Sequence, residues 1–109
     1  MARTVVDALE EKKGEDILLL DIREIALFAE YFVICSGTSD RMLQALADAA
    51  QEQVKKRYAL LGRVEGSSRN GWVLVDFGDV ILHLFSPERR DYYRLEELWG
   101  KGKTLLHLQ

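Results

Sequence analysis

The segment Ser36-Gly37-Thr38-Ser39-Asp40 has the residue types best suited to chemistry, and it joins a predicted strand to a predicted helix. Small polar residues at a helix N-terminus can bind an anion, because the first backbone N–H groups of a helix have no partner within it. The segment lacks the lysine and the glycine spacing of a P-loop. Capping of the helix by these residues is therefore the favoured interpretation, and an anion site is the alternative.

The same turn is similar to the Gly-Ser turn of nucleotidyltransferases, which hold Mg²⁺ between paired carboxylates and phosphates. No Asp/Glu-x-Asp/Glu pair occurs in the chain. Four aspartates that could serve do not form an obvious cluster: Asp21, Asp40, Asp76 and Asp79. We therefore expect no catalytic residue, no metal and no cofactor. A nucleotidyltransferase-like nucleotide-binding enzyme is kept as the alternative function.

The remaining reactive side chains favour structural roles. Cys35 is the only cysteine and lies in a predicted strand, so we expect a buried thiol without an activating base. His83 and His107 are too few for a zinc site, and we expect His83 at the surface or in an interface. Arginines and carboxylates are mixed after Pro87, which favours solvated ion pairs over a phosphate site for Arg89, Arg90 and Arg94.

Composition indicates one soluble domain spanning residues 1–109. Hydrophobic residues make up 48% and charged residues 30% of the chain, and the net charge is −3. An acidic chain argues against a DNA- or RNA-binding protein, whose phosphate contacts need a basic surplus. The single cysteine and the absence of a long apolar run predict a cytoplasmic protein with no membrane segment.

Local signals predict an α+β fold with a small mixed sheet and helices mainly on one face. A short helix is expected at Thr4–Lys13, capped by Thr4 and ended by Gly14, and a longer one at about Ser39–Tyr58. Ser86 and Pro87 begin a terminal helical region that runs toward Trp99 and Gly100. The expected strands are Ile17–Ile22, Tyr31–Cys35, Arg63–Glu65 at an edge, Trp72–Asp76, Asp79–Phe85 and the tail at 101–109. The segment Arg23–Glu30 is interpreted as a connection with one turn of helix, and Gly66–Gly71 as a loop.

The hairpin is the most informative element. With Phe77 and Gly78 as its loop, Val75 pairs with Val80, and successive residues alternate between two faces. One face is aliphatic and suits the core: Val73, Val75, Val80, Leu82 and Leu84. The other is mixed and predicts an exposed partner-binding surface: Trp72, Leu74, Asp76, Asp79, Ile81, His83 and Phe85. The alternative is that the terminal helix covers this face.

Two blocks of sequence resemble the ribosomal silencing factor family, also called RsfS or Iojap. They are EYFVICSGTSDRMLQALAD, from Glu30 to Asp48, and EGSSRNGWVLVDFGDVILHLFSPERRDYYRLEELW, from Glu65 to Trp99. Both occur in the family's order and at its usual separation, and the resemblance covers about residues 4–99. Glu30 stands where the family usually has Asp.

The resemblance implies a fold similar to that of nucleotidyltransferases without their catalytic carboxylates. It also implies a non-enzymatic factor that binds the large ribosomal subunit through its L-fourteen-family protein, blocks subunit joining and represses translation, with a role in large-subunit assembly. Members can form homodimers. Carried onto this chain, the family's binding surface adds Tyr93 to the hairpin face, so the expected partner-binding residues are Trp72, Leu74, Ile81, His83, Phe85 and Tyr93.

Overall fold

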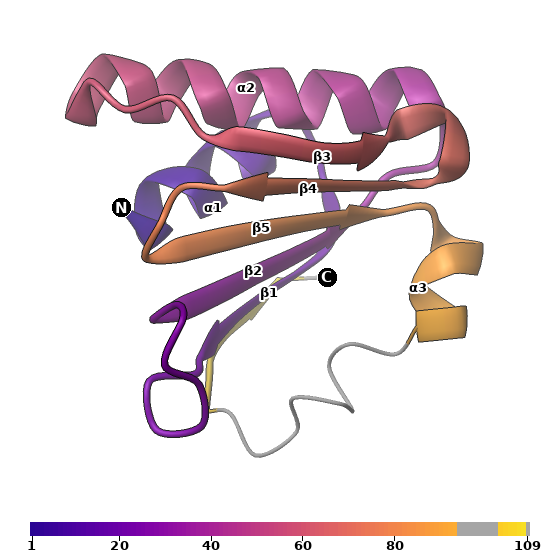
Figure 1. Cartoon of the computed structure of the whole chain (residues 1–109). Helices are drawn as coiled ribbons and strands as arrows, with labels where there is room; N and C mark the ends of the chain where they lie inside the picture. The colour runs from indigo at the N-terminus through magenta and orange to yellow at the C-terminus, as the bar shows by residue number, and fades with distance from the viewer. Residues whose placement is uncertain (94–102, 109) are drawn as a thin grey trace.

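The computed structural model describes residues 1–93 and 103–108, which fold into one mixed sheet with two of the described α-helices on one side (Figure 1). The order of elements is α1 (Ala2–Glu11), β1 (Glu15–Asp21), β2 (Tyr31–Ser36), α2 (Asp40–Tyr58), β3 (Arg63–Ser67), the 3-10 helix η1 (Ser68–Asn70), β4 (Trp72–Asp76), β5 (Val80–Phe85), α3 (Pro87–Tyr93) and β6 (Lys103–Leu108). The strands lie in the order β3-β4-β5-β2-β1-β6. Only β2 and β5 are parallel neighbours, and the other described pairs are antiparallel. The predicted α+β class and mixed sheet are confirmed.

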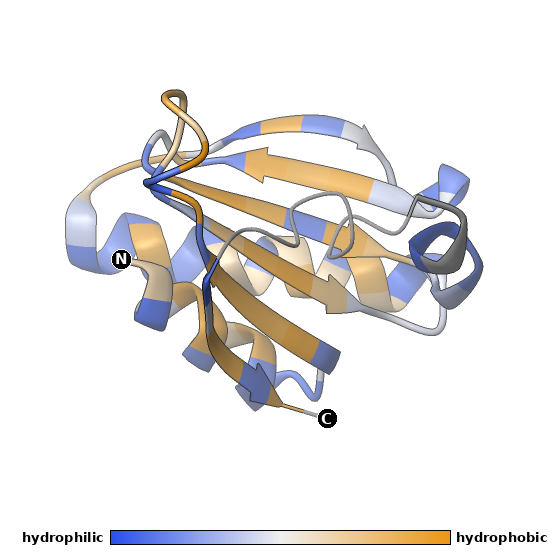
Figure 2. Cartoon of the chain, turned by 90° about the horizontal axis from the view of Figure 1, so that it is seen from below, coloured by the Kyte–Doolittle hydropathy of each residue, from blue (hydrophilic) through white to orange (hydrophobic). Residues whose placement is uncertain are grey.

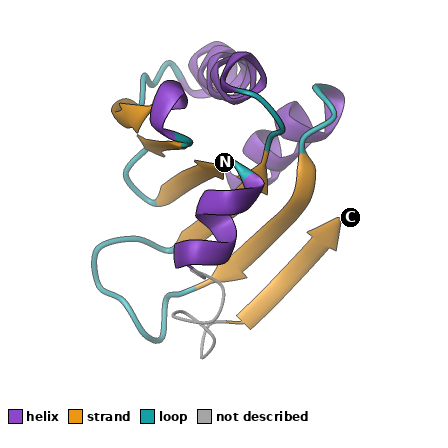
Figure 3. Cartoon of the chain, turned by 90° about the vertical axis from the view of Figure 1, so that its right-hand side faces the viewer, coloured by secondary structure: helices purple, strands orange, loops and turns teal. Residues whose placement is uncertain are grey.

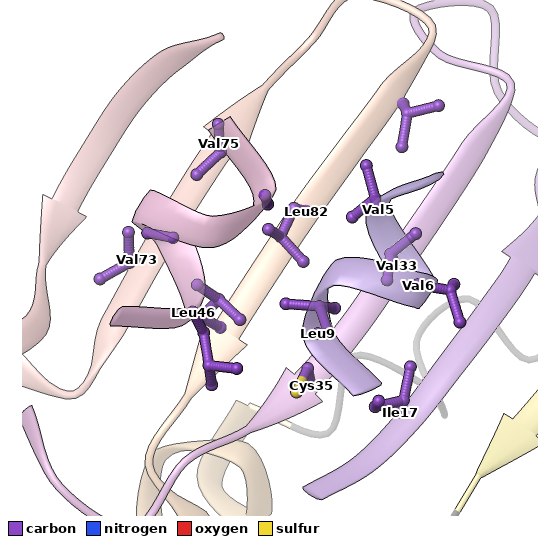
Figure 4. Packing of buried hydrophobic residues seen from close by; sticks show 14 of the residues in the cluster. Val5, Val6, Leu9, Ile17, Val33, Cys35, Leu46, Val73, Val75 and Leu82 are labelled. Atoms are coloured by element: carbon purple, nitrogen blue, oxygen red, sulfur yellow. The ribbon is translucent and has the colours of Figure 1, made fainter. Parts of the chain in front are cut away.

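The main core lies between the sheet and helices α1 and α2, which cover the same face of the strands (Figures 1 and 3). Figure 4 shows Val5 and Leu9 of α1 and Leu46 of α2 pointing at Val33 and Leu82 of the central strands, and all five side chains are fully buried. The aliphatic hairpin face therefore does form the core, as its alternation predicts. Burial of this apolar surface is the main stabilisation of the fold.

Helix α2 begins and ends on clear local signals. The Ser39 side chain accepts a hydrogen bond from the Met42 backbone N–H at 3.1 Å, so capping of the helix is confirmed. At the other end Lys55, Lys56 and Arg57 lie near the helix carbonyls, where positive charge is favourable. The helix ends at Tyr58, as predicted, and Ala59 after it takes the left-handed conformation, with φ of 52°.

Helix α1 differs from the prediction at both ends. Thr4 is not its cap, because the helix already begins at Ala2 and Thr4 is buried within it. Lys13, with φ of 62°, takes the left-handed position expected of Gly14. Position 14 requires glycine because of close packing rather than backbone conformation: a Cβ atom there would lie 2.5 Å from the Cys35 sulfur.

The hairpin register is shifted by two residues from the prediction. Val75 pairs with Leu82 rather than Val80, and Asp76 pairs with Ile81. Phe77 donates its backbone N–H to Val80 O at 2.9 Å, so the turn residues are Gly78 and Asp79. A shift of two leaves every side chain on its predicted face, and it lets the Phe77 ring pack in the main core.

Three further expectations have clear outcomes. The segment 23–30 forms no helix, although the Ala26 N–H donates to Ile22 O at 2.9 Å in a single turn. The edge strand β3 and the tail strand β6 are both present, and β6 pairs with β1. The part of the predicted terminal helix beyond Tyr93, including Arg94, Trp99 and Gly100, lies outside the described residues. In the described part of the chain, no helix has the length and apolar character needed to cross a membrane.

Candidate functional site

The face of the sheet opposite α1 and α2, called here the second face, carries a row of aromatic rings. Phe28 in the β1–β2 connection lies 6.0 Å from Phe32 of β2, measured between ring centroids. The Phe32 ring meets the edge of the His83 ring at 4.8 Å. His83 stacks near Phe85 at 6.1 Å, and Phe85 stacks near Trp72 of β4 at 5.8 Å. The row runs across β2, β5 and β4, and pairs of this geometry stabilise one another.

The row is unevenly exposed. Trp72 and Leu74 of β4 are half-buried, whereas Ile81, His83 and Phe85 of β5 retain only 9%, 6% and 1% of their surface. The second face is therefore less open than the strand pattern suggested, and among its described hairpin residues those of β4 are more exposed than those of β5. Tyr93 ends α3, and its side chain lies outside the described part of the structure.

A second hydrophobic cluster explains this burial. Ile22 and Ala29, at the two ends of the β1–β2 connection, are buried with Phe32, Ile81 and Phe85, and Trp72 and Leu74 pack at its margin. The connection therefore folds against the second face. No periodic pattern of residues indicates this contact, because Ile22 and Ala29 lie outside any helix or strand.

His83 is buried, so the expectation of a surface position is wrong. Neither ring nitrogen has a hydrogen-bond partner in the described structure. Burial without a counter-charge lowers the pKa of His83 to about 4, because the imidazolium would lose its hydration. The ring is therefore neutral at physiological pH and acts as an aromatic member of the cluster.

Arg90 forms an ion pair, as predicted, but the pair is not solvated on the arginine side. Nη2 lies 3.5 Å from Asp16 Oδ2, and the guanidinium is buried. Nη1 donates to Asp16 O at 2.6 Å and to Ser36 Oγ at 2.9 Å. Asp16 presents that carbonyl from an irregular position in β1, where its φ is 50°. Arg90 therefore connects α3 to β1 and β2. Arg89 remains exposed, and Arg94 is not described.

Cys35 is a core residue, as predicted. It is fully buried, and desolvation raises the pKa of its thiol to about 12. A thiol with this pKa is protonated and a poor nucleophile at neutral pH.

The Gly37–Asp40 turn lies beside a depression of about 670 Å³. Ser39, Arg69 and Arg89 line it, together with the carboxylates Asp40 and Glu88. The Ser39 hydroxyl is engaged in the cap, and Asp40 Oδ1 accepts from the Arg41 N–H at 2.9 Å. Within the described residues, no three His, Cys, Asp or Glu side chains are close enough together to hold a metal ion.

Sequence reasoning missed an exposed apolar segment in the β1–β2 connection. Leu27 and Phe28 retain 104% and 59% of their surface, and Ile25 retains 36%. A signal was present, because residues 23–30 contain none of the glycine, proline, asparagine, aspartate or serine typical of turns.

Comparison with known proteins assigns the chain to a family. The family model described as "ribosomal silencing factor during starvation" matches residues 1–108. A protein named ribosomal silencing factor RsfS from Bacillus subtilis is 45% identical over 93 residues, which are 85% of this chain and 79% of the relative. A mouse protein named mitochondrial assembly of ribosomal large subunit protein 1 is 35% identical, over 87% of this chain and 43% of its own length.

A solved structure agrees with the fold. The crystal structure of a Chromobacterium violaceum protein superposes with a TM-score of 0.85 at 37% sequence identity, covering 90% of this chain and 82% of that one. The sheet and its helical layer are thus shared with a relative whose structure was determined by experiment.

Proposed function

Because the chain belongs to the ribosomal silencing factor family, we propose that it binds the large ribosomal subunit where the small subunit docks and sterically prevents their joining. The observation that carries this proposal is the family match over residues 1–108, which include every described helix and strand. Repression of translation then requires affinity and position rather than chemistry. The factor is accordingly proposed to be non-enzymatic.

The proposed direct partner is the L-fourteen-family protein of the large subunit. Trp72 and Leu74 are the proposed contact residues, because they combine apolar surface with partial exposure. Ile81, His83 and Phe85 support them from beneath, and Tyr93 is the proposed contribution of α3. A depression of about 380 Å³ beside Trp72, also lined by Asn70 and Arg89, gives a partner side chain room to insert. The net charge of −3 favours encounter with a basic protein.

The proposal has three further parts. The protein acts in the cytoplasm, where translating ribosomes are found. It takes part in large-subunit assembly, as the name of the mouse relative states for that protein. When no subunit is bound, the exposed face of β4 contacts a second copy in a homodimer. The dimer must then dissociate before this face can bind the large subunit.

Sedimentation of purified ribosomal subunits tests the function. We expect the protein to migrate with free large subunits, to be absent from joined ribosomes, and to lower the fraction of subunits that join when the small subunit is added. Migration with joined ribosomes, without any loss of joining, would contradict the proposal. The matched control is Trp72→Ala, which should restore joining.

The enzymatic alternative is tested separately. Incubation with labelled nucleotide and Mg²⁺ should give no incorporation above background, because the turn at Gly37–Asp40 is used to cap α2. Incorporation that Asp40→Ala abolishes would support a nucleotidyltransferase-like enzyme instead.

A further inference from the structure

The connection between β1 and β2 presents the densest group of exposed apolar side chains in the described structure. Leu27 is fully exposed, Phe28 retains 59% of its surface and Ile25 retains 36%. The other large exposed hydrophobic residues are spread singly over α2, β3, β6 and the α2–β3 connection. Figure 1 shows this connection projecting beyond the ends of the strands, and Figure 2 shows hydrophobic colour at its tip. Single exposed apolar residues are ordinary, but a cluster on a projection marks an interaction site.

The projecting segment is held firmly at its base. Ile22 donates its N–H to Glu30 O at 3.0 Å, and both Glu30 and Tyr31 donate to Asp79 O, at 2.8 and 3.0 Å. Ile22 and Ala29 are buried in the second cluster. Both ends of the segment are therefore held in place before binding. Such preorganisation reduces the entropy lost when a partner binds.

The charges around the tip favour a basic partner. Arg23 is engaged by Asp21, with a contact of 2.6 Å between Nη2 and Oδ2. In the described structure, the carboxylates of Glu24, Glu30 and Asp79 have no cation within ion-pair distance. A second copy of this segment would bring these carboxylates against their equivalents, which is unfavourable, whereas lysine or arginine side chains would complement them.

The tip and Trp72 can reach the same partner. Phe28 lies 6.0 Å from Phe32 of β2, and Phe32 pairs with Ile81 of β5, whereas Trp72 pairs with Phe85, four residues further along β5. Two strand spacings across the sheet and four residues along it separate Phe32 from Trp72 by about 17 Å. An interface of ordinary size, about 800 Å² on each partner, covers both positions.

We propose that residues 22–30 form a second anchor for the large ribosomal subunit, in which Leu27 and Phe28 insert into an apolar pocket bordered by lysine or arginine side chains on a subunit protein. This inference rests on the proposed function, and it adds a site outside the hairpin. The anchor predicts that two separate surfaces, one at Trp72 and one at Leu27 and Phe28, contribute to one binding event.

The test measures the affinity of purified large subunits for three forms of the full chain. These are the unaltered protein, the double variant Leu27→Ser with Phe28→Ser, and the control Leu61→Ser. Leu61 is 68% exposed and lies between α2 and β3, outside the β1–β2 connection. We expect the double variant to bind at least tenfold more weakly and the control to stay within twofold. The denaturant midpoints of all three forms should agree, because exposed side chains add little to stability.

Each outcome bears on one proposal or the other. If the unaltered protein binds and the double variant binds equally well, the second anchor is wrong and the proposed function stands. If the unaltered protein does not bind the large subunit, both are wrong. Sedimentation velocity without ribosomes tests whether the segment is instead a contact between two copies of the chain. If the double variant loses self-association but still binds the large subunit, the segment is a dimer contact and the inference is wrong.

A charge-reversal variant examines the partner's chemistry. Glu24→Lys with Glu30→Lys should slow association with the large subunit, because the partner's basic groups would then be repelled. Faster association would point to an acidic partner and overturn the proposed pocket.

Discussion

At the scale of single residues, His83 shows how burial rather than residue type sets a side chain's role. The ring is packed between aromatic neighbours with no hydrogen-bond partner in the described structure. Protonation of such a histidine destabilises the folded state, because the folded state binds a proton more weakly than the unfolded chain.

This burial predicts a loss of stability in acid. The pKa of His83 falls from 6.5 to about 4 on folding, so its contribution is full above pH 6.5 and is lost as the pH falls toward 4. At pH 5 the expected loss is about 2 kcal/mol of unfolding free energy. Denaturant titrations at pH 7.5 and pH 5 measure it. His83→Leu should reduce the difference between the two pH values, and a difference unchanged in this variant would contradict the prediction.

Cys35 gives a second prediction at this scale. Its thiol is fully buried and its pKa is raised to about 12, so native protein should react with a thiol reagent far more slowly than unfolded protein. The measurement is the labelling rate with and without denaturant. Rapid labelling of native protein, at a rate independent of added denaturant, would place the thiol at the surface and contradict its position in the core.

At the scale of elements, the two faces of the hairpin should respond differently to truncation. Leu82→Ala removes a fully buried side chain and should cost about 2–5 kcal/mol of unfolding free energy. Trp72→Ala should affect stability less, because Trp72 is half-buried, and should weaken binding to the large subunit by roughly thirtyfold. Denaturant midpoints and co-sedimentation measure the two effects. Reversed effects would mean that the faces have exchanged roles.

The contact between α3 and the sheet predicts a second difference between neighbours. Arg90→Met would remove the donor to Asp16 O and Ser36 Oγ, and it should lower the unfolding free energy by about 2 kcal/mol. Arg89→Met is the matched control and should change it by less than about 0.5 kcal/mol, because Arg89 is exposed. Equal losses in the two variants would show that the buried hydrogen bonds do not hold α3.

At the scale of the whole molecule, charge predicts how binding depends on salt. The chain carries a net charge of −3, and its proposed partner is basic. Raising the salt concentration should slow association with the large subunit, by on the order of tenfold, because screening weakens electrostatic steering. Stopped-flow or surface-binding kinetics measure this rate. An association rate that rises with salt would mean that like charges meet in the complex.

The sequence predicted most of the fold because strong local signals mark its elements. Ser39 and Pro87 begin helices, and alternation in the hairpin assigns its faces. The register was missed because a turn at Phe77-Gly78 and a turn at Gly78-Asp79 place every hairpin side chain on the same face of the sheet. Only the packing of the Phe77 ring in the core distinguishes the two registers.

The candidate site was less predictable than the fold, because it too depends on packing between distant parts of the chain. The burial of His83 and Phe85 involves Ile22 and Ala29, which come from a segment without periodicity. The role of Arg90 depends on a carbonyl 74 residues away in the chain. Contacts of this kind are properties of the assembled sheet, and a local pattern cannot show them.

Strand β6 has a consequence for how the protein is made. It pairs with β1 along one edge of the sheet, although the two strands lie at opposite ends of the described chain. During synthesis, β1 therefore cannot pair with β6 until residues 103–108 have left the ribosome. Until then the backbone N–H and C=O groups on this edge of β1 are unpaired and can bind other chains. A nascent or truncated chain that stops before β6 should thus be prone to aggregation, even though its helices and its central strands are complete.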